Sequence, residues 1–320
     1  MRPEVRHLRR RFQIITMFAA IGLVVAVWPA GAEQITDVHA NVTVAHPAFA
    51  GNAGPAIAID AGHYNFHTMS GRFAPFAALL RNDGFRVTSI AGKFERDSLK
   101  DINILVIANA LNVQNENRWA LPTPSAFTLS EIASVKAWVQ SGGALLLIAD
   151  HLPFAGAASE LAASFGFTFV NGFALQDFTR PIDFFTLASN TLRNDVITRG
   201  RDAQETVTTV ATFTGSAFKP PPGALDILVL SRNFMILEPA VAWNFTATTL
   251  RQPGYGFLQG AAIPFGKGRV AVFGEAGMFT AQIQTDPPSS LIGFNATGAG
   301  QNKQFILNVM HYLAGILPRR

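Results

Sequence analysis

Short apolar runs alternate with amphipathic stretches from Ala56 onward, and this alternation limits the possible folds more than any other feature of the chain. Parallel strands need crossover connections, which helices usually supply, so the alternation predicts a parallel sheet covered by helices. The predicted strands are 56–60, 86–90, 102–108, 144–149, 206–213, 225–230, 257–263 and 269–273. The predicted helices are 72–83, 128–141, 157–165 and 303–317.

Local signals support several of these boundaries. Gly84 follows the first helix, in the position where glycine commonly ends a helix. Thr128 and Glu131 form a capping box at the start of the second. The strands 257–263 and 269–273 flank Gly266-Lys267-Gly268, which predicts a hairpin. We divide the chain into a signal peptide (1–32), a lead-in segment (33–55) and one α/β domain (56–317) with an irregular insertion at about 171–222.

The N-terminus has the three parts of a cleavable signal peptide. Five Arg precede an apolar run of 12 residues, 17–28, and Ala30-Gly31-Ala32 supplies a small-x-small cleavage pattern. The run is shorter than a membrane span, which needs about 20 apolar residues, so we predict a periplasmic or secreted protein with no stable membrane anchor after cleavage. The segment 9–12 reads Arg-Arg-Arg-Phe, which leaves twin-arginine export open beside the general route.

The charge of the chain changes once the signal peptide is removed. Subtracting its five Arg and Glu4 from the totals of 25 basic and 21 acidic residues leaves 20 of each. A nucleic-acid-binding protein needs an excess of basic residues to neutralise phosphates, so we expect no nucleic-acid partner. The chain has no cysteine, which excludes disulfides, a lipid anchor on cysteine and a thiol nucleophile.

Polar residues follow four of the predicted strands. Ligands of open parallel sheets bind beyond the carboxyl ends of the strands, so these residues are the candidates for a site. They are Asp60, His63 and His67 after the first strand, Asn109 and Asn112 after the third, Asp150 and His151 after the fourth, and Glu275 after the strand 269–273.

Three interpretations of this cluster stay open. His63, His67, Asp150, His151 and Glu275 could bind a divalent metal such as zinc or manganese. Alternatively, Asp60, His63, Asp150 and His151 could be catalytic acid–base groups without metal, with a carboxylate orienting a histidine. Taken singly, each residue could also be a helix cap or a buried turn partner. For the cluster as a whole we favour a site, because convergent polar groups mark pockets.

Several familiar motifs are absent. The chain contains neither the Gly-x-Ser-x-Gly elbow nor the His-Glu-x-x-His zinc motif. The segment 260–267 resembles a phosphate loop only superficially, because its spacing is one residue too long. Arg72 and Lys267 could hold an anion, but we interpret both as solvated surface residues.

Four segments resemble one protein family. Asp60-Ala61-Gly62-His63-Tyr64-Asn65-Phe66-His67 with Gly71-Arg72-Phe73 and 80–85, the central segment 142–151, the late segment 266–275 and the closing helix 304–315 are similar to bacterial proteins of the class I glutamine amidotransferase-like superfamily, in a branch of unknown function that lacks the catalytic cysteine. The resemblance spans about 56–317. It implies a flavodoxin-like, doubly wound, mostly parallel sheet with helices on both faces. It does not imply amidotransferase activity, since that chemistry needs the missing cysteine.

Two functions follow as hypotheses. The first is an exported hydrolase-like enzyme whose site combines His, Asp and Glu, with or without a divalent metal that activates water. The second is a non-catalytic module that binds a small molecule or saccharide on the same fold. Tyr64, Phe66, Phe154 and Phe265 are the candidates for stacking on sugar rings, although most of the 27 Phe must belong to the core.

Overall fold

The protein is described by a computed structural model that places residues 33–177, 182–285 and 289–319. The predicted signal peptide, residues 1–32, lies outside the described residues. Within the described part, no helix is long and apolar enough to cross a membrane.

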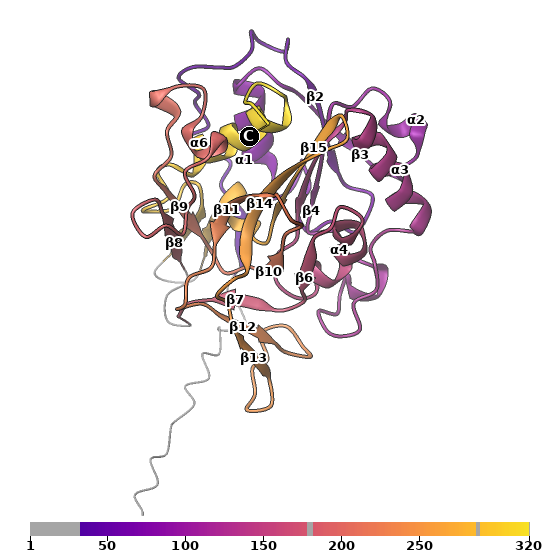
Figure 1. The fold of residues 1–320 in the computed structure, drawn as a ribbon, viewed down its shortest axis with the longest axis vertical. Helices are drawn as coiled ribbons and strands as arrows, with labels where there is room; N and C mark the ends of the chain where they lie inside the picture. Colours follow the sequence, from indigo (N-terminus) through magenta and orange to yellow (C-terminus); the bar gives the residue numbers. More distant parts are fainter. Residues whose placement is uncertain (1–32, 178–181, 286–288, 320) are drawn as a thin grey trace, which may run out of the picture.

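A nine-stranded sheet forms the centre of the described chain (Figure 1). Its strand order is β3-β2-β4-β5-β15-β14-β10-β6, with β11 also paired to β14. The first five strands in this order are parallel. They are β3 (Arg86–Ile90), β2 (Ala56–Asp60), β4 (Ile104–Ala108), β5 (Ala144–Ile148) and β15 (Gly268–Phe273). This order of parallel strands is that of a flavodoxin-like, doubly wound sheet, as the sequence predicts.

The other strands of this sheet are antiparallel to their neighbours. They are β14 (Leu258–Phe265), β11 (Leu225–Val229), β10 (Ala217–Lys219) and β6 (Thr168–Val170). The predicted hairpin is present as β14–β15, and its turn is the pair Gly266-Lys267. Gly266 has a φ of +56°, which suits the first position of a two-residue hairpin turn.

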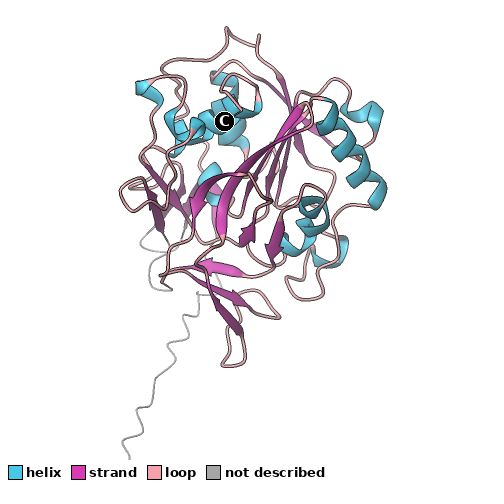
Figure 2. Ribbon diagram, viewed as in Figure 1, coloured by secondary structure: helices cyan, strands magenta, loops and turns pink. Residues whose placement is uncertain are grey.

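Helices cover both faces of the sheet (Figure 2). On one face, α1 (Ala74–Asn82) and α6 (Asn302–Leu313) pack on Ile57, Ile59, Val106 and Leu146. On the other face, α2 (Arg96–Leu99), α3 (Leu129–Ser141) and α4 (Phe154–Ala163) pack on Ala58, Leu105, Ile107 and Leu145. Successive strand residues point to opposite faces, so a strand buried on both sides reads as an unbroken apolar run. α5 (Val196–Arg199) lies beside α6.

The local helix signals hold in the structure. Thr128 and Glu131 form the reciprocal capping box of α3. Gly84 follows α1 with a φ of +91°. α4 begins three residues earlier than predicted, at Phe154, and α6 ends four residues earlier, at Leu313. The early end of α6 has a local cause, since Gly315 takes a φ of +83° that a helix cannot continue.

Three small sheets complete the described chain. The first contains β1 (Gln34–Thr36), β16 (Ala281–Gln284) and β17 (Ser290–Gly293), so part of the lead-in segment is a strand. The second contains β7 (Phe173–Leu175), β12 (Met235–Glu238) and β13 (Leu250–Pro253), and the third pairs β8 (Asp183–Thr186) with β9 (Thr209–Thr212). The 3₁₀ helices are η1 (Val113–Asn115), η2 (Ala203–Glu205) and η3 (Gly277–Phe279).

Candidate functional site

The register of the sheet brings Asp150 and Glu275 side by side. β5 and β15 are parallel neighbours in which Ile148 pairs with Phe273. Asp150 and Glu275 each stand two positions beyond these residues, on the same face of the sheet. The chain therefore leaves both strands with a carboxyl group at the same level along the strand direction. Asn109, after β4, fixes this edge further, because its Oδ1 accepts a hydrogen bond from the Asp150 N–H at 2.9 Å.

Both carboxyl groups have pKa values raised above those of isolated carboxyl groups. Burial raises the pKa of Asp150, against the opposing effects of His151 and several hydrogen bonds. Burial raises the pKa of Glu275 well above its usual value, and the neighbouring charge of Asp150 raises it further. The Glu275 carboxylate accepts hydrogen bonds from the N–H groups of Gly277 and Met278 at the start of η3, which fix its position. Since two neighbouring buried carboxylates repel each other, protonation of one member of the pair is favoured.

His151 lies next to this pair, and one of its two ring nitrogens is engaged in a hydrogen bond. Its Nδ1 is 2.8 Å from the carbonyl oxygen of Leu152. A carbonyl only accepts hydrogen bonds, so Nδ1 carries the proton and Nε2 of the neutral ring is a free base. The ring stacks on Phe173 at 4.3 Å between centroids and meets Trp243 edge-on at 4.8 Å. These contacts fix the orientation of the imidazole.

A cavity of about 380 Å³ opens at this edge of the sheet. Its polar lining includes five of the residues that the sequence selects: His67, Asn109, Asp150, His151 and Glu275. Aromatic rings from four loops and from the start of α4 form much of the apolar wall: Phe66, Trp119, Phe154, Phe213 and Trp243. β1 contributes the amide of Gln34, and β16 contributes those of Gln282 and Gln284. A small cavity with aromatic walls and a few convergent polar groups is the usual form of a small-molecule site.

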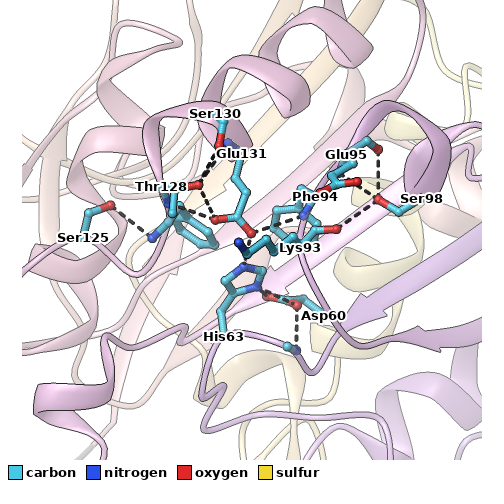
Figure 3. A network of polar contacts seen from close by, with 12 residues as sticks. Asp60, His63, Lys93, Phe94, Glu95, Ser98, Ser125, Thr128, Ser130 and Glu131 are labelled. Carbon is cyan, nitrogen blue, oxygen red and sulfur yellow. Dashed lines mark hydrogen bonds and ion pairs between the residues drawn. The ribbon is translucent and has the colours of Figure 1, made fainter.

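The structure places Asp60 and His63 elsewhere (Figure 3). His63 lies between two carboxylates, with Nδ1 3.0 Å from Asp60 and Nε2 3.0 Å from Glu131. All three side chains are buried, and neither Asp60 nor His63 lines the cavity. The sheet explains the separation, because β4 lies between β2 and β5 and spaces their ends by about 10 Å.

The charges in this second group are mutually compensated. Burial lowers the pKa of His63, but hydrogen bonds and charges from Asp60 and Glu131 outweigh it and raise the pKa. Burial alone raises the pKa of Glu131, whereas hydrogen bonds from Thr128 and His63 bring it down to about 2. Glu131 also accepts hydrogen bonds from the N–H groups of Phe94 and Thr128. We call Asp60, His63 and Glu131 the closed triad, because every ring nitrogen and carboxylate in it has a partner.

His67 is only four residues from His63, but it belongs to the cavity. The segment that carries both is a loop of turns rather than a helix, so their spacing does not place them on one face. The His67 ring stacks on Phe73 at 5.1 Å, and its buried Nδ1 has no hydrogen-bond partner among the described residues. Burial, and then the charge of Arg72, lower the pKa of His67 to about 3, so the ring is neutral at ordinary pH.

The sequence does not indicate the roles of several residues in these two regions. Arg72, expected on the surface, is half-buried and lines the cavity. Trp119 and Trp243 come from loops without a recognisable pattern. Glu131 carries a signal, the capping box, but nothing in that motif indicates its bond to His63. Of the predicted stacking residues, Phe66 and Phe154 line the cavity, whereas Tyr64 and Phe265 do not.

The metal prediction meets a specific difficulty. One predicted ligand, His63, has both ring nitrogens engaged by carboxylates. Among residues 33–177, 182–285 and 289–319, no three His, Asp or Glu side chains form a group that could hold a metal ion. We therefore derive no step through a metal. The prediction of a divalent ion stays a prediction, which metal analysis of untagged protein tests directly.

Comparisons with known proteins bear on the fold. No family profile matches the chain, and no curated protein sequence matches it. Among solved structures, the chain is similar to the N-terminal domain of mmIFT52, with 14% identity, a TM-score of 0.54 and coverage of 81% of this chain and 96% of that one.

Two further structures have lower TM-scores. A ThuA-like protein from Bacteroides uniformis is 12% identical, with a TM-score of 0.40 and coverage of 86% of this chain and 94% of that one. A GMP synthase component from Thermoplasma acidophilum is 13% identical, with a TM-score of 0.38 and coverage of 81% and 96%. The structural neighbours thus include proteins with the glutamine amidotransferase-like fold. At these identities the similarity concerns the fold alone.

Proposed function

We propose that this protein is a hydrolase that cleaves a glycosidic bond of a small saccharide in the cavity beyond β5 and β15. One observation carries the proposal: Asp150 and Glu275 stand together with raised pKa values in a cavity that His151 also lines. Glycoside hydrolysis needs a carboxylic acid that stays protonated and gives its proton to the leaving oxygen, together with a base that activates water; the raised pKa values support the first role, and Nε2 of His151 could supply the second. The aromatic walls supply apolar surface for sugar rings, and the amides supply hydrogen bonds for hydroxyl groups.

The groups present suffice for a balanced reaction. The proton held by the Asp150–Glu275 pair passes to the leaving oxygen as its bond to the anomeric carbon breaks. A water molecule forms the new bond to that carbon, and its proton passes to Nε2 of His151. Return of this proton from His151 to the carboxyl pair restores the starting state. Asp150 is the member that meets the ligand, since it is partly exposed whereas Glu275 is fully buried.

A non-catalytic saccharide-binding module is the second candidate. The observation that favours it is the number of rings around the cavity, with Phe66 and Trp119 5.1 Å apart and Trp119 and Phe154 4.9 Å apart. Such a wall binds a sugar whether or not the carboxyl pair reacts with it. In this case the raised pKa values of the pair would follow from burial and from the repulsion between the two groups, with no role in a reaction.

One experiment separates the two candidates. The mature protein is incubated with a panel of p-nitrophenyl glycosides, and binding of the parent sugars is measured by calorimetry. The hydrolase proposal expects release of nitrophenol that Asp150→Asn abolishes while sugar binding persists. Binding without release from any glycoside would contradict it and support the binding module.

We also propose export by a signal peptide, which lies outside the described residues, and membership of a superfamily branch, which the structural similarities do not show. The signal peptide would export the protein, which cell fractionation of a chain with and without residues 1–32 tests. The protein would belong to the cysteine-free branch of the amidotransferase-like superfamily that its four motif segments resemble. In keeping with the absence of cysteine, the protein would not hydrolyse glutamine.

A further inference from the structure

Arg72 is a cation in the cavity without a carboxylate partner. Among the described lining residues it is the sole Lys or Arg. It forms no ion pair within the described part of the chain, although the charge of Glu33 acts on it from farther away. Its Nη2 donates to the carbonyl oxygen of Gln34 at 3.0 Å, while its Nε is buried and has no partner.

The guanidinium is held in place by its surroundings. Its central carbon lies 4.1 Å from the centroid of the Phe66 ring, a cation–π contact that fixes the plane of the group. The bond to Gln34 on β1 fixes it from the other side. A planar group of N–H donors held in this way is prepared for an oxyanion, and pairs best with a carboxylate through two parallel hydrogen bonds.

His67 supplies a second unsatisfied polar atom in the same cavity. The side chain is 4% exposed, and its Nδ1 has no partner within the described residues. Both side chains line the cavity and contact the same ring: the His67 ring lies 5.3 Å from that of Phe66, over which Arg72 is placed. A neutral imidazole has one N–H to donate, and its buried donor or acceptor is costly to leave unpaired. A ligand group at this place would satisfy both residues.

We infer that Arg72 and His67 form a subsite for a carboxylate of the ligand, so that the substrate is an acidic saccharide of the uronate type. That the ligand is a substrate rests on the proposed function, whereas the subsite itself rests on the geometry of the two side chains. Asp150 and Glu275 line another part of the cavity, beyond β5 and β15. They act on the glycosidic bond while Arg72 binds the acid group. A single cation beside a carboxyl pair matches a singly charged carboxylate better than a doubly charged phosphate monoester.

Binding measurements with simple probes test the subsite. The Kd values of D-glucuronate and D-galacturonate are compared by calorimetry with those of D-glucose and D-galactose, and inorganic phosphate is a further probe. We expect the uronates to bind at least about 10-fold tighter than the neutral sugars, because hydrogen bonds between charged groups are the strong ones. Phosphate is expected to bind more weakly than either uronate.

Variants assign the preference to the subsite. Arg72→Gln should remove the preference for uronates, and Arg72→Lys should retain part of it, since it keeps the charge without the fork. Arg96→Gln removes one charge from the exposed side of α2 and should leave the preference unchanged. If Arg72→Gln does not fold, Arg72→Lys together with His67→Gln replaces it, and each should weaken uronate binding more than glucose binding.

The outcomes distinguish the inference from the proposed function. Equal affinity for acidic and neutral sugars, no saturable binding of any of them, tighter binding of phosphate, or a preference that survives in Arg72→Gln would overturn the carboxylate subsite. Asp150→Asn should keep the uronate preference while losing turnover of a p-nitrophenyl glucuronide. Wild-type protein that binds uronates selectively but releases no nitrophenol would overturn the hydrolase proposal and leave the subsite standing.

Discussion

Two groups of histidine and carboxylate side chains lie at the carboxyl edge of the same parallel sheet, and they differ in how completely their polar atoms are paired. In the closed triad, His63 has a carboxylate at each ring nitrogen. In the cavity, neither Nε2 of His151 nor Nδ1 of His67 has a hydrogen-bond partner among the described residues, and two carboxyl groups share one environment.

This difference separates a structural group from a reactive one. A buried polar group that is fully paired stabilises the fold and has no capacity left for a ligand. Buried groups with unused hydrogen-bonding capacity cost stability, and proteins keep them where a ligand or a reaction uses them. Both regions combine histidine with carboxyl groups near the carboxyl ends of the strands, so pairing is the property that distinguishes them.

The largest expected effect is on turnover. Asp150→Asn removes the exchangeable proton of the carboxyl pair and His151→Gln removes the free base, so each should lower kcat by about 10²–10⁴-fold. Stability should stay equal or rise by about 0.5–2 kcal/mol, as is common when a strained active-site group is replaced. Initial rates with a p-nitrophenyl glycoside and urea unfolding measure the two quantities. His39→Gln, an exposed histidine, is the control. Full activity of either cavity variant would contradict the assignment of the cavity residues as the reactive group.

The closed triad should behave in the opposite way. His63→Ala leaves Asp60 and Glu131 buried without their counter-charge, and removal of one member of a buried ion pair costs about 3–5 kcal/mol. The free energy of unfolding from urea titration should fall by this order, while kcat of the remaining folded protein changes little. A loss of kcat in His63→Ala comparable to that of His151→Gln, with normal stability, would show that the triad takes part in catalysis.

The sequence predicts the carboxyl pair of the cavity better than it predicts the closed triad. Strand ends follow from apolar runs, and β2 and β3 have the predicted bounds, because their apolar residues alternate or run together as buried strands require. Asp150 and Glu275 could then be grouped from strand ends alone. The partner of His63 could not, since Glu131 comes from another helix and its capping motif has a sufficient local explanation.

The parts that the sequence does not predict depend on partners distant in the chain. β6, β7 and β10 have three residues each, and such short strands exist because another segment pairs with them. The same holds for β1, where Gln34 pairs with Gln284 near the other end of the chain. Arg72 and Trp119 enter the cavity through loop conformations that no periodicity records. Loops thus carry the part of the site that is least visible in the sequence.

A pH titration of stability distinguishes His63 from His67. The raised pKa of His63 means that its contribution is fully present below pH 6.5 and is lost as the pH rises through the folded-state pKa. The pKa of His67 is lowered to about 3, so the unfolded chain binds the extra proton and stability falls as the pH drops from 6.5 towards 3. Each group changes the slope by at most about 1.4 kcal/mol per pH unit.

Matched variants read out these slopes. His67→Gln should lose less stability than wild type between pH 6.5 and 4, and His63→Gln should lose less than wild type above pH 6.5. The measurement is urea unfolding at a series of pH values, with His39→Gln as the variant expected to follow wild type. Parallel curves for His67→Gln and wild type below pH 6.5 would show that His67 is accessible to protons in the folded protein.

The smallest expected effect concerns the aromatic walls of the two regions. Trp119 is half-buried and contacts Phe66 and Phe154 in the cavity, whereas Phe127 is buried against His63 at 4.9 Å. Trp119→Ala should weaken sugar binding by about 2–10-fold, since an aromatic contact contributes about 0.5–1.5 kcal/mol. Phe127→Leu should lower stability and leave the Kd unchanged. If instead Trp119→Ala unfolds the protein without weakening binding in its folded fraction, the cavity wall is a structural core like that around His63, and pairing alone would distinguish the two regions.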